Sequence, residues 1–94
     1  MRTIWKFPLT ASTVQVVKMP KGAKILSVHL QRGTPCIWAL VDWELGEPEA
    51  AHVDRLVYLY GTGDLFELPE VAEFVGTFMT EDGRYVFHVF DGGE

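Results

Sequence analysis

The chain has 94 residues, of which 48% are hydrophobic and 22% charged, and its formal net charge is −5. This length predicts a single domain over residues 1–94, and the composition excludes the disordered class. The acidic balance argues against nonspecific binding to a nucleic acid polymer or an anionic membrane, because both require a net basic face. A small anionic ligand in a local basic pocket remains compatible with it.

The first third of the chain predicts two strands. They cover Thr3 to Phe7 and Thr13 to Met19, both rich in β-branched and aromatic residues. Two adjacent valines, Val16 and Val17, break the alternation of the second strand, and we interpret them as a β-bulge. Pro20-Lys21-Gly22 follows as a turn, since proline fixes φ and glycine tolerates a positive φ.

The next two strands predict a hairpin. The third strand runs from Lys24 to Arg32, and the fourth from Pro35 to Asp42, with Arg32-Gly33-Thr34 turning one into the other. The third strand alternates at a period of two. The residues that we expect on its inward face are Leu26, Val28 and Leu30.

An acidic connection at residues 43–52 separates this hairpin from the second half of the chain. Its segment 48–51 predicts one helical turn, because Pro48 suits the first helical position and Glu49 the positive end of the dipole. Val53 to Tyr60 is the predicted fifth strand, and the Gly61-Thr62-Gly63 run ends it.

The remaining residues predict an irregular segment and a second hairpin. Residues 64–73 are irregular, and Phe74 to Met79 pairs with Tyr85 to Phe90 across a short turn. Residues 91–94 are expected to fray. The chain is therefore predicted to be all-β, with about seven short antiparallel strands, mostly joined by hairpins as a meander, in a compact sandwich or small barrel.

Two strands are apolar on both faces. Cys36 to Val41 is apolar throughout, and in the last strand Tyr85, Phe87 and Val89 share one face while Val86, His88 and Phe90 share the other. One sheet in so short a chain cannot hide two apolar faces, so we expect a homo-oligomer whose interfaces enclose a ligand. The alternative is that segments 43–52 and 64–73 cover the outer face.

The sequence predicts no enzyme, cofactor or metal site. It contains no G-x-S-x-G elbow, P-loop, H-E-x-x-H or Cys-x-x-Cys motif. The three histidines, His29, His52 and His88, lie on separate elements, and Cys36 sits in an apolar strand. The lone cysteine, the missing signal peptide and the missing apolar run of membrane length indicate the cytoplasm.

Several residues predict a binding site instead. Tyr60-Gly61-Thr62-Gly63 ends a strand and could form a backbone anion nest, although a plain turn explains it too. Aromatic rings suited to stacking on a base are Trp5, Trp38, Trp43, Tyr58 and Tyr60, with a core role as the alternative for Trp5 or Trp38. Basic residues suited to a phosphate are Lys18, Lys21, Lys24, Arg32 and Arg55, with solubility as the alternative. His88 on the last strand completes the set, with a satisfied or solvated strand histidine as the alternative.

Five segments carry a resemblance that spans most of the chain. They are Ile4–Leu9 (IWKFPL), Met19–Val28 (MPKGAKILSV), Pro35–Asp42 (PCIWALVD), Tyr60–Gly63 (YGTG) and Val86–Phe90 (VFHVF). Together they resemble a family of short proteins without assigned activity that occurs mainly in tailed phages and prophages. The family is similar to viral sponges that bind cyclic nucleotide immune signals without cleaving them. The resemblance implies a non-enzymatic anti-defence protein in the cytoplasm of a bacterial host.

Three functions therefore stay open. The first is a homo-oligomeric sponge for a nucleotide signal, with a ligand site drawn from Lys21, Lys24, Arg32, Trp38, Trp43, Arg55, Tyr60, Gly61, Thr62, Gly63 and His88. The second is a protein-interaction module that inhibits a host factor through its acidic loops. The third is a minor virion or assembly protein.

Overall fold

A computed structural model describes residues 1–42 and 52–94. These residues form seven strands and no helix, which confirms the all-β prediction. The strands are β1 (Arg2–Pro8), β2 (Val14–Pro20), β3 (Lys24–Gln31), β4 (Thr34–Asp42), β5 (His52–Gly61), β6 (Glu73–Met79) and β7 (Val86–Gly93). The predicted helical turn at residues 48–51 lies outside the described residues.

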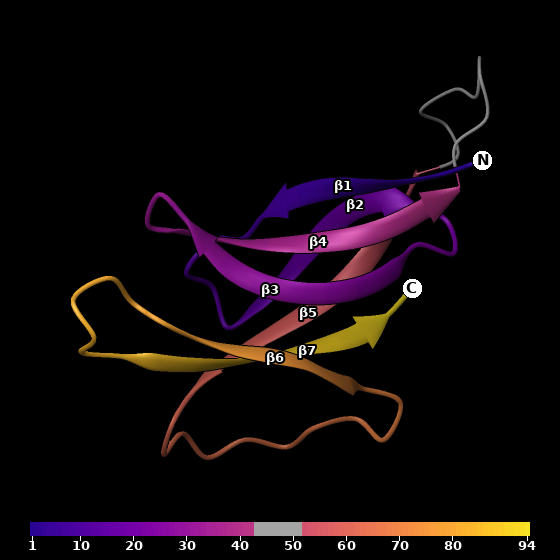
Figure 1. The fold of residues 1–94 in the computed structure, drawn as a ribbon. Coiled ribbons are helices and arrows are strands. Elements are labelled where there is room, and N and C mark those ends of the chain that lie inside the picture. The colour runs from indigo at the N-terminus through magenta and orange to yellow at the C-terminus, as the bar shows by residue number, and fades with distance from the viewer. Residues whose placement is uncertain (43–51) are drawn as a thin grey trace.

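The strands form two antiparallel sheets packed face to face as a sandwich (Figure 1). One sheet has the order β1-β4-β3 and the other the order β2-β5-β7-β6. Among described consecutive strands, only β3–β4 and β6–β7 pair as hairpins, whereas a meander was expected. The chain instead crosses between the sheets after β1, β2 and β4, because each crossing lets a strand bury one apolar face against the opposite sheet.

The β3–β4 turn has the backbone conformation that a right-handed sheet twist prefers. Arg32 has φ 50° and Gly33 has φ 80°, the two positive values of a type I′ turn. Glycine adopts this region without steric penalty, whereas arginine does not. The predicted hairpin is therefore correct, and its turn keeps a cationic side chain at the end of the sheet.

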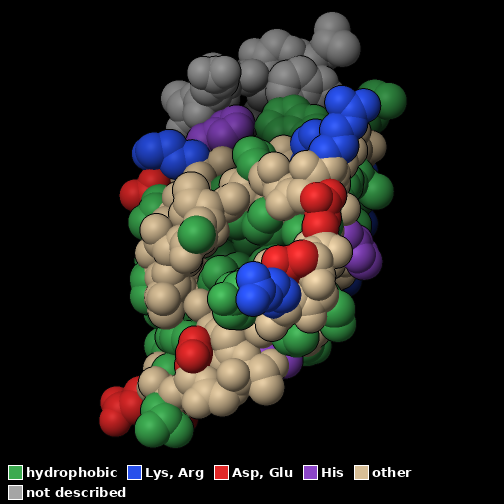
Figure 2. Space-filling view, turned by 90° about the vertical axis from the view of Figure 1, so that its left-hand side faces the viewer, with side chains coloured by type: hydrophobic (Ala, Val, Ile, Leu, Met, Phe, Trp, Pro, Cys, Tyr) green, Lys and Arg blue, Asp and Glu red, His purple; other side chains and the backbone are tan. Residues whose placement is uncertain are grey.

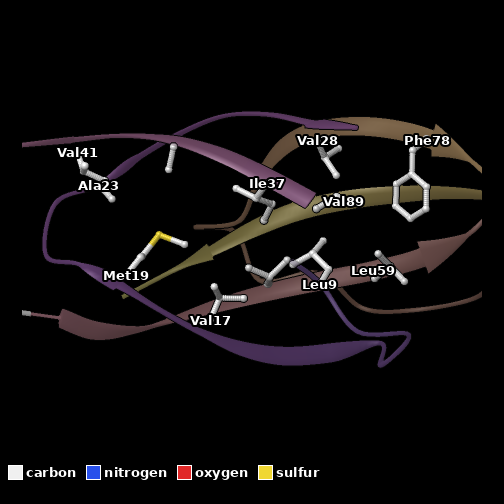
Figure 3. Packing of buried hydrophobic residues seen from close by; sticks show 12 residues of the cluster. Leu9, Val17, Met19, Ala23, Val28, Ile37, Val41, Leu59, Phe78 and Val89 are labelled. Carbon is white, nitrogen blue, oxygen red and sulfur yellow. The ribbon is translucent and has the colours of Figure 1, made fainter. Parts of the chain in front are cut away.

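The core lies between the two sheets (Figure 3). Alternate residues of β4 and β5 point into it, and Met19, Ile37, Val57 and Val89 are fully buried. Cys36, Trp38 and Leu40 occupy the other face of β4, so that strand is apolar on both sides, as predicted. In β7, Phe87 and Val89 likewise reach the core while the alternate residues face outward.

Three bulges shift the register at places that the sequence reading missed. β2 pairs with β5 without interruption, so the bulge predicted at Val16 and Val17 is wrong. The extra residues are instead Leu26 in β3, Gly92 in β7 and Val75 in β6. Because Leu26 is the extra residue, it is 42% exposed and not inward, although Val28 and Leu30 face the core as predicted.

The end of the chain is ordered, contrary to the expected fraying. β7 continues to Gly93, and the Glu94 carboxylate accepts a hydrogen bond of 2.6 Å from the Gly22 N–H in the β2–β3 turn. The last residues are therefore attached to a turn 72 positions earlier in the chain.

Candidate functional site

The predicted basic group divides into separate places. Lys24 and the Arg32 turn lie at opposite ends of β3, roughly 23 Å apart at 3.3 Å per residue. Lys21 is exposed in the β2–β3 turn, and Lys18 pairs with Asp54 at 3.0 Å. One ligand phosphate cannot contact all of these residues, so the predicted cluster is not a single site.

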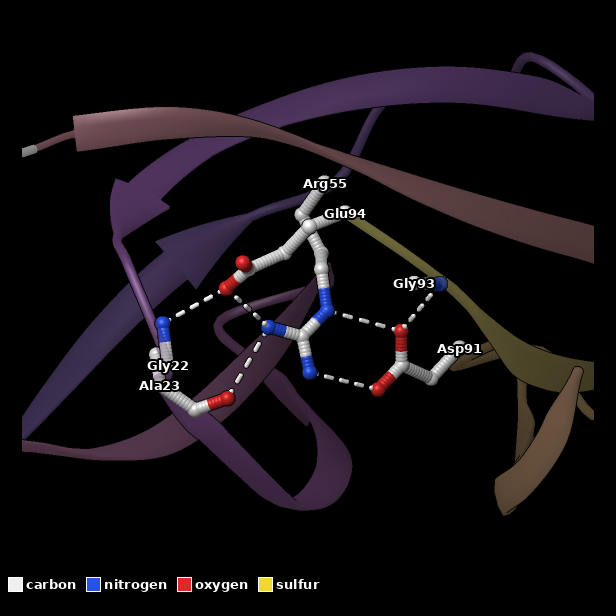
Figure 4. Close-up of polar contacts among 6 residues, drawn as sticks. All are labelled: Gly22, Ala23, Arg55, Asp91, Gly93 and Glu94. Atoms are coloured by element: carbon white, nitrogen blue, oxygen red, sulfur yellow. Dashed lines mark hydrogen bonds and ion pairs between the residues drawn. The ribbon is translucent and has the colours of Figure 1, made fainter. Parts of the chain in front are cut away.

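Arg55 is committed to the fold (Figure 4). It is buried, its Nε and Nη2 donate to the two carboxylate oxygens of Asp91 at 2.8 Å each, and its Nη1 donates to the Ala23 carbonyl at 2.9 Å. Glu94 lies 3.4 Å from the same Nη1. The predicted phosphate role of Arg55 is therefore wrong, because its donors already have partners.

The charges of this cluster stabilise one another. Burial alone would raise the pKa of Asp91, but the Arg55 guanidinium and the Gly93 N–H hold that pKa below its usual value. The hydrogen bond to Asp91 in turn raises the pKa of Arg55. Such a buried pair fixes the position of β7 relative to β5 and the β2–β3 turn.

The predicted anion nest at Gly61-Thr62-Gly63 is already filled. The Gly61 N–H donates to the Asp64 carboxylate at 2.7 Å, and the Thr62 N–H donates to the Val86 carbonyl at 3.1 Å. The Asp64 N–H closes the turn onto the Gly61 carbonyl. A carboxylate of the chain thus occupies the place where a ligand anion was expected, and the plain-turn alternative describes this segment.

Tyr60 and His88 lie on the outer face of the four-stranded sheet. Tyr60 is buried there because Phe66 stacks on it, with ring centroids 3.6 Å apart and planes 1° apart. The two ring nitrogens of His88 lie 2.7 and 3.0 Å from the hydroxyls of Thr62 and Thr77. No basic side chain among the described residues of these strands joins them, so they form an aromatic surface without a phosphate partner.

Trp38 lies on the opposite side of the molecule, the outer face of the three-stranded sheet. It is half-buried, its Cα partner in β1 is Lys6, and the His29 ring lies 5.9 Å away. Trp5 is on the other face of that sheet, where it packs against the core and stacks with His52. The core alternative therefore holds for Trp5, while Trp38 keeps a face toward solvent. Trp43 lies outside the described residues.

A basic groove lies beside Trp38. Its volume is about 530 Å³, and it is lined by Lys6, Pro8, Gln31, Arg32, Thr34 and Cys36. Among the described residues of this lining, Lys6 and Arg32 are the charged ones, and Lys6 Nζ donates to the Gln31 side-chain carbonyl. The carboxylate of Glu81 lies next to Gly33 of the hairpin turn. Together with Asp82 it lines a different hollow.

The sequence reading found Arg32 and Trp38 but missed the rest of this groove. Lys6 reaches it because β1 pairs with β4, which places Lys6 beside Trp38. That pairing joins residues that lie far apart in the sequence, such as Lys6 and Trp38, so local patterns carry no signal for it. The alternation of β1 does predict that Lys6 faces away from the core.

A second, apolar hollow opens between the two sheets at the same end of the molecule. Its volume is about 190 Å³, and its walls include Leu9, Leu59, Phe78 and Phe87. Figure 2 views this end, where hydrophobic side chains line a hollow with charged side chains around it. The hollow is a gap at the open end of the core, and its described lining residues are all uncharged.

Comparisons with known proteins identify the family alone. A family model described as a domain of unknown function (DUF7352) matches residues 1–94. No curated protein and no solved structure matches the chain. Within residues 1–42 and 52–94, no group of three His, Cys, Asp or Glu residues is placed to hold a metal ion. The same residues contain no helix that could cross a membrane.

Proposed function

We propose that this chain, which belongs to the DUF7352 family, binds and sequesters a cyclic nucleotide immune signal in the groove beside Trp38. The observation that carries the proposal is the lining of the groove. In a chain of net charge −5, the lining residues within 1–42 and 52–94 include two cations, Lys6 and Arg32, and no carboxylate. A local positive field of this kind attracts a phosphate despite the overall charge.

The groove and the neighbouring Trp38, which lies next to Lys6, together offer a partner for each part of a nucleotide. The planar guanidinium of Arg32 can hold two phosphate oxygens at once, and the Lys6 ammonium adds a point charge. Gln31 and Thr34 add polar groups along the same wall. Trp38, with His29 beside it, provides a flat surface for a base, and such stacking contributes roughly 1–3 kcal/mol.

The volume also suits this ligand class. Sites for small molecules are commonly 300–1,000 Å³, and the groove has about 530 Å³. Sequestration needs binding groups alone, so the proposed activity requires no group that attacks the phosphate. The resemblance of five segments to phage and prophage proteins supports an anti-defence role in a bacterial cytoplasm for such a binder.

Calorimetry with a panel of cyclic di- and trinucleotides and cyclic ADP-ribose isomers tests the proposal. We expect one ligand to bind, and chromatography after denaturation to recover it unaltered. Arg32→Ala and Lys6→Ala should each weaken binding tenfold to a hundredfold, since a hydrogen bond to a charged group contributes about 1.5–3 kcal/mol.

Lys24→Ala is the matched control, because it removes a cation from the same strand at the far end. Its affinity should stay within twofold of the parent. The proposal is wrong if no panel member gives heat at micromolar protein, or if Arg32→Ala binds as well as the parent. Capture of one stoichiometric host protein without nucleotide binding would instead support the interaction-module alternative.

A further inference from the structure

The outer face of the four-stranded sheet carries an uninterrupted apolar row. The register places Val14 of β2 beside Tyr58 of β5, Tyr58 beside Phe90 of β7, and Phe90 beside Phe74 of β6. The row therefore crosses all four strands. Val16 and Leu56, also paired with each other, extend it on one side. We call these six residues the apolar face.

The apolar face is exposed. Val14, Val16 and Phe74 are 51%, 54% and 61% accessible to solvent. Since a large side chain carries roughly 150–250 Å² of surface, the face leaves on the order of 500 Å² of apolar area in contact with water. That is about the size of the largest apolar patch of an ordinary monomer, and such a patch is often functional.

The face carries no unpaired charge. Among the described strand residues that point outward from this sheet, only Lys18 and Asp54 are charged, and they pair with each other at 3.0 Å. A charged partner would therefore gain nothing here. Two copies of this acidic chain, in contrast, can meet through this neutral face with little electrostatic repulsion.

We propose that the apolar face binds the same face of a second copy of this chain. Two faces of this size bury on the order of 1,000 Å² from these side chains alone, which reaches the area that a specific interface needs. A two-fold axis brings identical residues together, so one surface can serve both copies.

The raised and open parts of this surface fit a two-fold axis that runs along the row from Val14 to Phe74. On one side of the row, Phe66 lies over Tyr60 and raises the surface. On the other side, Val16 and Leu56 are open. Rotation about the row places the raised side of each copy over the open side of the other. The covering by segment 64–73 that the sequence left open is thus partial, because Phe66 covers Tyr60 and touches the Phe90 ring but leaves Val14 and Phe74 exposed.

The proposed interface lies on the opposite sheet from the groove, so the two proposals are independent. Each copy would keep its own groove open to solvent, in contrast to the ligand enclosed between subunits that the sequence suggested. Loss of nucleotide binding would not affect the dimer, and a monomer could still bind nucleotide.

Sedimentation velocity over a concentration series tests this inference. We expect the parent to have twice the 10.6 kDa mass of one chain at micromolar concentration. Phe74→Glu and Val16→Glu should each raise the dimer dissociation constant at least tenfold, with circular dichroism confirming the fold. The matched control is Ile4→Glu, which changes a 55% exposed side chain on the outer face of the other sheet and should leave the dimer intact.

Two results would overturn the inference. One is a parent that stays monomeric at several hundred micromolar. The other is a dimer that Ile4→Glu dissociates while Phe74→Glu and Val16→Glu do not.

Discussion

Arg55 and Asp91 join β5 to β7 through two parallel hydrogen bonds of 2.8 Å each. The pair is almost enclosed, with side-chain accessibilities of 10% and 14%. Arg55 also holds Glu94 and the Ala23 carbonyl, so one guanidinium connects the end of the chain to the β2–β3 turn. Removing one partner of such a buried bidentate ion pair leaves the other charge uncompensated and destabilises the folded state.

Asp91→Asn should remove an acid-dependent part of the stability. The folded pKa of Asp91 lies below its unfolded value of about 3.9. Its contribution is therefore fully present above about pH 5 and is lost as the pH falls through the folded pKa. Melting temperatures between pH 7 and pH 2 should show a variant that is less stable at neutral pH and converges with the parent in acid.

Asp54→Asn is the control for this pH series. It removes the exposed carboxylate that pairs with Lys18, and exposed ion pairs contribute little to the free energy of unfolding. Its curve should follow that of the parent. Parallel curves for the parent and Asp91→Asn would contradict the role assigned to the buried pair.

Gly92→Ala should destabilise the fold. A Cβ at this bulge residue would lie 2.5 Å from Cε2 of Tyr58 and 3.0 Å from Cβ of Leu56. Relieving such a clash shifts side chains and backbone, and we expect a loss of about 1–3 kcal/mol in the free energy of unfolding. Urea denaturation at fixed protein concentration measures it.

A double-mutant cycle identifies the cause of that loss. Tyr58→Ala removes the closest clashing atom, so the coupling between Gly92→Ala and Tyr58→Ala should exceed 0.5 kcal/mol. Additive effects would mean that the Tyr58 ring is not the reason why position 92 requires glycine.

Phe66→Ala should cost about 1 kcal/mol or more, because it removes the ring that covers Tyr60. The neighbouring Leu65 is 99% exposed, and Leu65→Ala should stay within about 0.5 kcal/mol of the parent. The midpoint of urea unfolding distinguishes the two variants. Equal effects would argue that segment 62–72 does not pack through Phe66.

Val28→Ala and Leu26→Ala test the bulge in β3. Val28 is buried against the core, so its truncation should cost about 2 kcal/mol. Leu26 is the extra residue of the bulge, and Leu26→Ala should be nearly neutral. Thermal unfolding of the two variants gives the comparison. A larger loss of stability for Leu26→Ala would mean that Leu26 points into the core, as the regular alternation of the strand predicts.

The strands could be predicted because the signals for them are local. Arg32-Gly33 marks its own turn, and the alternation of the last strand puts Phe87 and Val89 on one face, although only the structure shows that this face is the core face. The bulges could not be predicted, since Leu26 looks like any inward residue of an alternating strand. Its extra position shows only when the register against β4 is known.

The candidate site was harder to predict than the fold, for the same reason. The groove forms over the end of β4, which lies between β1 and β3 next to the hairpin turn, so Lys6 and Arg32 line one groove through strand pairing that no short motif encodes. Arg55 shows the opposite error. Its charge suggested a ligand, but Asp91 lies 36 residues away in sequence, and its partnership becomes visible only in three dimensions.

The left-handed backbone of Arg32 has a practical consequence for engineering. Its φ of 50° is unfavourable for an arginine, and an Asn-Gly pair is the preferred sequence for this turn. A library selected for heat resistance alone should therefore enrich asparagine at this position. Thermostabilised versions obtained in that way would have a less strained turn but would lack the guanidinium that the proposed nucleotide binding requires.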